Sequence, residues 1–142
     1  MNAVLVGLAA AVGAPALKDP PKPQTQILGE WQLIEWFING SAQTFADGAG
    51  TEFLPGGVRK WRNGSEEPGE RGYKLYPDTR PAAMDLIRTD GPQRQSVFPS
   101  IYRIDGDKLV LCIAAAGGER PRGFDPTDGQ MLMKFTRIKR KD

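Results

Sequence analysis

The sequence predicts an all-β protein, specifically an antiparallel up-and-down β-barrel of about eight strands. Short runs rich in aromatic and β-branched residues recur along the chain, and 17 glycines and 12 prolines supply the turns between them. The chain has 142 residues, which suits a single domain with one hydrophobic core. A meander of this kind is expected to close into a barrel because closure removes the exposed strand edges.

The predicted strands are separated by turn-forming residues. The first covers residues 28–38 and stops at Asn39-Gly40, the dipeptide that most readily adopts the positive φ angles of a tight hairpin. The remaining predicted strands cover residues 51–54, 58–63, 71–76, 82–88, 97–104, 108–114 and 130–139.

Two carboxylates flank Gly106 in the stretch IYRIDGDKLVLC, so this stretch is either a turn or a reactive acid pair. A two-residue loop at Gly106-Asp107 places Asp105 opposite Lys108, so that opposite charges meet. A loop shifted by one residue places Arg103 opposite Lys108, and the like charges repel. We therefore predict a hairpin in which Asp105 has a lysine partner and Asp107 is a turn residue.

The composition excludes several kinds of chemistry. The chain has no histidine, which excludes imidazole acid-base catalysis and histidine-containing zinc sites. The single cysteine, Cys112, excludes an intramolecular disulfide, and the hairpin pairing predicts that it is a small apolar core residue. We therefore expect a protein that is not an enzyme and has no metal or cofactor. An enzyme using carboxylates and tyrosine remains the alternative, with Glu35 and Asp85 as its best candidates.

The N-terminal part of the chain differs from the rest. Residues 1–16 are apolar, without a basic residue, and end in Ala14-Pro15-Ala16, a small-x-small pattern typical of signal peptidase cleavage. This segment is short for a membrane span. Residues 17–27 are predicted to be a proline-rich linker, and residues 28–142 the barrel domain. We expect an exported protein, periplasmic or extracellular, with a cytoplasmic location as the alternative and no stable membrane span.

A contact between the first and the last predicted strands is expected. Gly29-Glu30-Trp31 opens the first strand and Arg137 lies in the last. This combination is similar to the calycin and lipocalin arrangement, in which a Gly-x-Trp tryptophan closes one end of the barrel and a late arginine stacks across its indole. A sheltered guanidinium over a tryptophan contributes about 0.5–2 kcal/mol, and here it would tie the first strand to the last.

Further motifs extend this resemblance over residues 28–140. The stretches LGEWQLIEWFINGS, YKLYPDTRPAAMDL, IYRIDGDKLVLCIA, GGERPRGF and FTRIKR together resemble an uncharacterised lipocalin-like domain family expanded in planctomycete bacteria. The resemblance implies an eight-stranded lipocalin-like barrel, often behind an export signal. It implies no activity, substrate or binding residue. The charged, glycine-rich residues 56–72 depart from the family pattern.

An eight-stranded barrel is either filled by side chains or wide enough for one small ligand. If Trp31 faces inward, strict alternation also turns Glu35 inward, unless a bulge or the barrel mouth exposes it. The candidate ligand-binding residues are Glu35, Tyr73, Asp85, Tyr102 and Arg120. A structural interpretation stands beside each: the tyrosines as core residues, Asp85 as a hydrogen-bond acceptor at a strand end, and Arg120 as a solvated or loop-bracing cation.

The expected function follows from the fold and the charge. The formal net charge is only +2, from 19 basic and 17 acidic residues, so no nucleic-acid partner is expected. We expect a binding module outside the cytoplasm that holds a small apolar or amphipathic ligand in the barrel. The alternative is a protein-interaction or inhibitor domain that acts through loops such as 39–50 and 115–129 and has a filled barrel.

Overall fold

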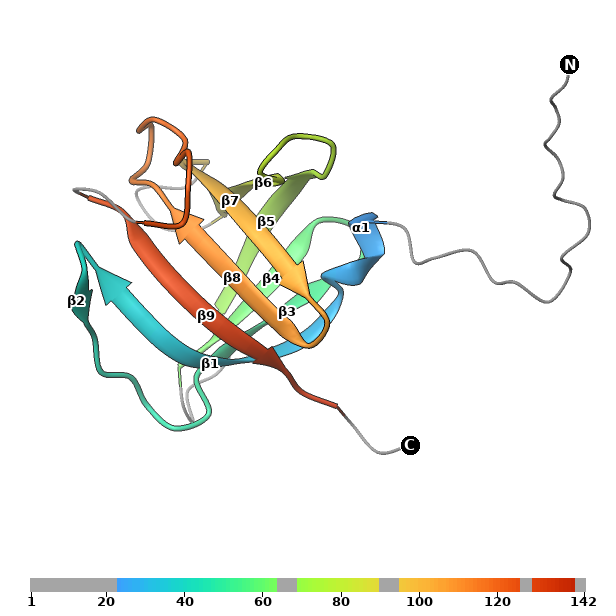
Figure 1. Ribbon diagram of the computed structural model, residues 1–142. Helices are drawn as coiled ribbons and strands as arrows, with labels where there is room; N and C mark the ends of the chain where they lie inside the picture. Colours follow the sequence, from blue (N-terminus) through green and yellow to red (C-terminus); the bar gives the residue numbers. More distant parts are fainter. Residues whose placement is uncertain (1–22, 64–68, 90–94, 126–128, 140–142) are drawn as a thin grey trace, which may run out of the picture.

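The computed structural model describes residues 23–63, 69–89, 95–125 and 129–139, and these form one antiparallel sheet preceded by a single helical turn (Figure 1). The elements are α1 (Pro23–Gln26), β1 (Gly29–Ile38), β2 (Ser41–Ala42), β3 (Gly50–Leu54), β4 (Val58–Arg62), β5 (Gly69–Tyr76), β6 (Ala83–Arg88), β7 (Val97–Asp105), β8 (Lys108–Ile113) and β9 (Met131–Arg137).

The sheet closes into a barrel. Strands β3 to β9 pair in sequential order, β1 pairs with β3 on one side and with β9 on the other, and every pairing is antiparallel. Eight of the strands in the described part of the chain thus form a closed up-and-down barrel, and β2 is an extra strand paired only with β1. The predicted fold class is confirmed, and the architecture is consistent with a lipocalin-like fold.

The two hairpins predicted from their turn residues are confirmed. Asn39 and Gly40 have φ angles of 51° and 80°, the two positive values that a tight two-residue turn requires. In the β7–β8 hairpin Asp105 pairs opposite Lys108, as predicted, and Gly106 carries the positive φ of 63°. Asp107 does more than turn the chain, because its carboxylate lies 2.8 Å from the ammonium of Lys139.

A β-bulge in β1 changes which side chains face the interior. The pairing with β9 shifts between Leu33 and Glu35, so that Ile34 is an additional residue and is 49% exposed. Glu35 consequently lies on the outer face, 3.5 Å from the ammonium of Lys134. The sequence allowed for a bulge that would expose Glu35, and the structure contains one, so strict alternation does not hold and Glu35 does not face inward. The next residue, Trp36, takes the inward position instead.

One end of the barrel is closed around Trp31. This side chain is fully buried, and its indole N–H donates to the carbonyl of Ile27 at 2.8 Å. The guanidinium of Arg137 lies 4.1 Å from the Trp31 ring centroid and donates to the carbonyls of Leu28 and Gln26. The predicted contact between the first and last strands is confirmed, with a cation–π interaction and two hydrogen bonds.

The backbone conformation explains why a glycine stands two residues before Trp31. Gly29 has a φ of 116°, which L-residues with a side chain rarely adopt, and a Cβ there would lie 3.4 Å from the Arg137 guanidinium. Gly29 therefore allows the chain to enter β1 directly beside the arginine.

The predicted division of the chain falls partly outside the described residues. Residues 1–16, the signal-peptide-like segment, and residues 17–22 of the linker lie outside them. Residues 23–26 of the predicted linker form α1, and Ile27 is fully buried in the core. None of the helices among the described residues is long and apolar enough to cross a membrane.

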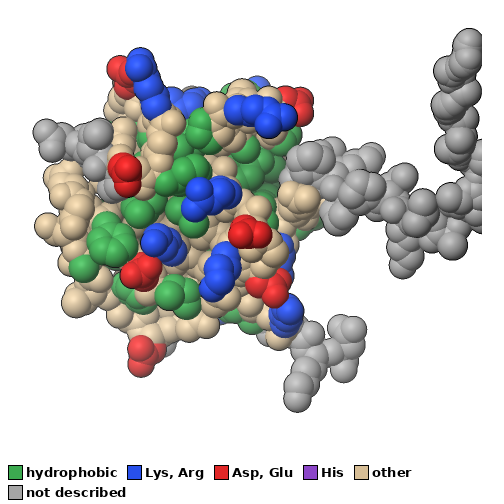
Figure 2. Space-filling model, in the orientation of Figure 1, with side chains coloured by type: hydrophobic (Ala, Val, Ile, Leu, Met, Phe, Trp, Pro, Cys, Tyr) green, Lys and Arg blue, Asp and Glu red, His purple; other side chains and the backbone are tan. Residues whose placement is uncertain are grey.

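Acidic and basic side chains are interspersed on the face of the barrel shown in Figure 2, with apolar patches between them. This mixture agrees with the small net charge of the whole chain.

Candidate functional site

The barrel is filled at one end and hollow at the other. At the hollow end, a cavity of about 340 Å³ lies between the last residues of β1, β4, β6 and β8 and the first residues of β5, β7 and β9. We call this cavity the mouth cavity. Its lining residues are Trp36, Arg59, Trp61, Arg71, Leu86, Ile87, Arg88, Phe98, Ile113, Met131 and Met133.

Strand pairing explains the apolar part of the lining. Trp61 is directly opposite the buried Thr51, so it faces the interior, and the β1 bulge turns Trp36 inward. The indole N–H of Trp36 points at the sulfur of Met131, at 3.4 Å. Phe98 pairs opposite the buried Leu86 and faces the same space. Aromatic and sulfur-containing side chains of this kind form adaptable apolar contacts.

The two tryptophans also line a neighbouring hollow. This second space, of about 350 Å³, is lined by Trp36, Thr44, Phe45, Ala46, Trp61 and Asn63.

The same cavity contains a row of three arginines. Arg59 on β4 is directly opposite Arg71 on β5, and Arg71 is directly opposite Arg88 on β6. Because Arg59 also pairs with the buried Phe53, the row faces the interior. Neighbouring strands are about 4.8 Å apart, so three positive charges lie side by side in the barrel wall.

Two of the three arginines, Arg59 and Arg88, are incompletely hydrogen-bonded by the described residues. The Nε atoms of Arg59 and Arg88 are buried and have no hydrogen-bond partner among the described residues. Arg59 donates one long bond, of 3.4 Å, to the hydroxyl of Thr51, and Arg71 donates to the carbonyl of Glu70 at 2.7 Å. The described lining of the cavity contains no aspartate or glutamate.

This environment perturbs the titration of Arg59. Burial, and secondly the charge of Arg71, lower the pKa of the Arg59 guanidinium from its ordinary value to about 10. The group still carries its proton at neutral pH. The mouth cavity therefore combines an apolar wall with a partly desolvated cation, and guanidinium groups bind carboxylates and phosphates through paired N–H donors.

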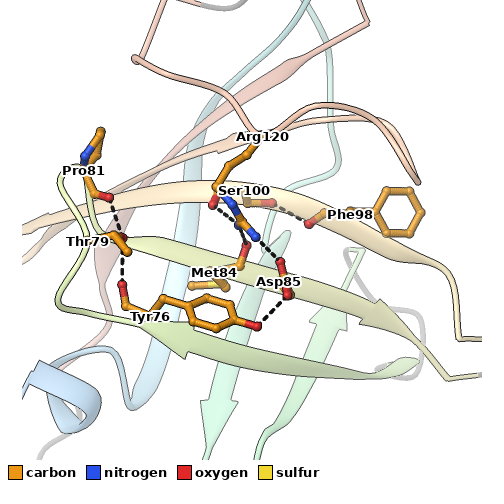
Figure 3. A network of polar contacts seen from close by, with 8 residues as sticks. All are labelled: Tyr76, Thr79, Pro81, Met84, Asp85, Phe98, Ser100 and Arg120. Carbon is orange, nitrogen blue, oxygen red and sulfur yellow. Dashed lines mark hydrogen bonds and ion pairs between the residues drawn. The ribbon is translucent and has the colours of Figure 1, made fainter.

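Two of the sequence-predicted residues meet at a different place, on the outer surface of the barrel (Figure 3). Arg120 donates to the carboxylate of Asp85 at 2.7 Å and to the carbonyls of Met84 and Ser100. The hydroxyl of Tyr76 donates to the other oxygen of Asp85, at 2.9 Å. These contacts fasten the loop after β8 onto β6 and β7, which supports the structural interpretation of both residues.

Replacing Asp85 with asparagine tests this role. The substitution preserves the shape but removes the charge that pairs with Arg120, and Asp85 is only 17% exposed. We expect Asp85→Asn to lower the free energy of unfolding by about 1 kcal/mol, measured by urea denaturation. Glu119→Gln, in the exposed pair with Arg122, is the matched control and is expected to change stability by less than about 0.5 kcal/mol. Equal effects of the two substitutions would contradict a bracing role for Asp85.

The two predicted tyrosines belong to the core. The hydroxyl of Tyr73 donates to the carbonyl of Leu54 at 2.7 Å, and its ring meets Phe53 edge-on, with centroids 5.0 Å apart. Burial raises the pKa of Tyr73, and burial together with the charge of Asp78 raises that of Tyr102. Neither tyrosine lines the mouth cavity.

Cys112 is also a core residue, as predicted. Its side chain is fully buried, its sulfur lies 3.8 Å from the amide oxygen of Gln130, and burial raises the pKa of the thiol. A raised pKa reduces the thiolate fraction, which is the nucleophilic form.

The five residues proposed from the sequence thus do not form one site. Glu35 lies on the outer face, and Tyr73 and Tyr102 belong to the core. Asp85 and Arg120 form an ion pair that holds the loop after β8 against the barrel. The sequence predicts none of the residues that line the mouth cavity as binding residues. Three of them, Arg59, Trp61 and Arg71, lie within residues 56–72, which depart from the pattern of the family that the chain resembles. The usable signal was the alternation within VRKWR, which places one arginine and one tryptophan on the same face of a strand.

The fold and the cavity define a class of protein: a small closed antiparallel barrel, consistent with a lipocalin-like fold, with one filled end and one hollow end. No protein-family model and no curated protein sequence matches the chain. The resemblance to a planctomycete lipocalin-like family therefore stays a prediction.

Proposed function

We propose that this protein is a non-enzymatic binding module that holds a small amphipathic ligand in the mouth cavity. The observation that carries the proposal is the cavity itself, because its walls combine Trp36, Trp61, Phe98 and two methionines with a few polar groups. Small-molecule sites in proteins are typically concave, mostly apolar, and supplied with a few polar groups that orient the ligand. A location outside the cytoplasm is part of this proposal and rests on the sequence of residues 1–16.

The volume limits the size of the ligand. Ligand sites commonly measure about 300–1,000 Å³, and the mouth cavity, at about 340 Å³, is near the lower limit. At about 30 Å³ per water molecule, this space corresponds to about eleven waters. A short alkyl chain or a single ring system with one polar group suits the cavity.

The alternative, an interaction domain with a filled barrel, fits the structure less well. The closed end is packed around Trp31 and Leu109, whereas the opposite end contains the cavity. One of the loops expected to bind a partner is fastened to the barrel by Arg120. These two observations support ligand binding in the interior over recognition through the loops.

Binding of a short alkyl compound tests the proposal. We expect 1-octanol to produce a saturable change in tryptophan fluorescence, because Trp36 and Trp61 line the cavity. The change should be reduced in Trp36→Phe and Trp61→Phe. Trp31, at the closed end, is the internal reference, since its indole lies away from the cavity. A response without saturation, or one unaffected by either substitution, would contradict binding at this place.

A further inference from the structure

We propose that the ligand of the mouth cavity is an anion with an apolar tail, and that Arg59 and Arg88 bind its carboxylate or phosphate group. This inference rests on the proposed function and deepens it. The apolar tail packs against Trp36, Trp61 and Phe98, and the head group lies against the arginine row.

A comparison of the two faces of the same strands supports this proposal. On the outer face, the row formed by β3, β4 and β5 reads Glu52, Lys60 and Glu70, so opposite charges alternate across the strands. On the inner face, the row formed by β4, β5 and β6 contains only arginines. Opposite charges in directly paired positions stabilise a sheet, and like charges destabilise it. The inner row therefore has no acidic residue in its directly paired positions, whereas the outer row has two.

The buried donors without a hydrogen-bond partner also support an anionic ligand. A buried donor without a partner is costly, and the cost is higher when the group is charged. Arg59 and Arg88 each leave a buried Nε without a partner among the described residues. An oxyanion supplies the missing acceptors and the missing negative charge together.

The spacing of the two arginines suits a single head group. Arg59 and Arg88 are two strand spacings apart, about 10 Å along the sheet, and their long side chains extend into the same cavity. Arg71, on the strand between them, adds a third positive charge to the electrostatic potential of the cavity. A neutral or cationic head group would gain nothing from this arrangement, and a cation would be repelled by all three guanidinium groups.

Four probes with the same alkyl chain test the inference: sodium octanoate, octyl phosphate, 1-octanol and octyltrimethylammonium. Titration calorimetry and tryptophan fluorescence on the full chain give their affinities. We expect the two anions to bind at least about tenfold more tightly than 1-octanol, and the cation to bind most weakly, since a tenfold ratio corresponds to 1.4 kcal/mol. The comparison of octanoate with octyl phosphate shows which anion the site prefers.

Substitutions on β4 and β6 locate the effect. We expect Arg59→Met and Arg88→Met each to reduce the affinity for the preferred anion by about tenfold, so that the preference for the anion over 1-octanol is lost. Lys60→Met is the matched control, because it removes one positive charge from the adjacent position of β4 on the outer face and should have no effect. Arg59→Lys keeps the charge without the paired donors and should recover part of the anion affinity.

The outcomes separate this inference from the proposed function. Equal affinities for octanoate and 1-octanol, or equal losses in Arg59→Met and Lys60→Met, would overturn the anion site while leaving the binding module intact. Failure of all four probes to bind at the cavity would overturn both. Circular dichroism of each variant confirms that the barrel is folded before its affinity is compared.

Discussion

Trp31→Ala is expected to lower the free energy of unfolding by about 3–5 kcal/mol, the range for removing a large aromatic side chain from a packed core. The indole is fully buried, donates to the carbonyl of Ile27 and lies beneath the guanidinium of Arg137. Its loss opens a cavity, leaves the Ile27 carbonyl without this donor and uncouples β1 from the last residues of β9. Urea denaturation followed by far-ultraviolet circular dichroism measures the change.

Trp36→Ala is the matched control for this prediction. The residue type and the strand are the same, but Trp36 is partly exposed and lines the mouth cavity. Because less packed surface is lost, we expect a decrease of less than about 2 kcal/mol. Similar losses for the two tryptophans would mean that the closed end is not the more stable end of the barrel.

Arg59→Met is expected to increase the free energy of unfolding, by about 1–3 kcal/mol. Burial and the nearby Arg71 lower the pKa of Arg59 from its ordinary value to about 10, so the charged form is less favourable in the folded state than in the unfolded state. An apolar side chain of similar length removes this cost, as replacement of buried charges by apolar residues often does. Residue 59 is partly exposed, so solvent screens its charge and the expected gain in the free energy of unfolding is smaller than the full value that the pKa shift implies.

The pH dependence of this stabilisation follows from the direction of the pKa shift. Below about pH 10 both the folded and the unfolded chain carry a protonated Arg59, so the full cost is present and the variant has its full advantage. Above about pH 10 the folded chain releases the proton before the unfolded chain does, and the advantage of Arg59→Met decreases. Thermal and urea denaturation at neutral pH and near pH 10.5 measure the two values. Lys60→Met, on the outer face, removes a lysine that pairs with Glu52 and Glu70 and should not increase stability. A variant less stable than the parent protein would show that the arginine row is compensated in the folded state.

The two effects of Arg59→Met, higher stability and lower anion affinity, belong together. A binding site that holds like charges side by side is costly for the empty barrel, and the bound anion offsets that cost. Natural proteins often lose stability at the positions that carry their function. The joint measurement of stability and anion affinity on one set of variants therefore tests a single physical statement about the mouth cavity.

The eight barrel strands, both tight hairpins and the contact of Trp31 with Arg137 were all predictable from the sequence. The strands and the turn at Asn39-Gly40 depend on local information, namely the alternation of apolar side chains and turn residues that permit positive φ. The register of the β7–β8 hairpin follows from the charges that it pairs across the strands, and the contact of Trp31 with Arg137 is what the calycin and lipocalin resemblance implies.

The binding site was decided by the tertiary structure. Because of the bulge at Ile34, the side chain of Trp36 faces the interior of the barrel and that of Glu35 does not. The alternation of side chains along a strand does not reveal where a single extra residue lies. The arginine row exists only because the registers of β4 with β5 and of β5 with β6 align Arg59, Arg71 and Arg88. A shift of one residue in either pairing would turn part of the row to the outer face, since neighbouring side chains in a strand point in opposite directions. The sequence by itself therefore determined the strands and the closed end, whereas cross-strand register determined the chemistry of the mouth.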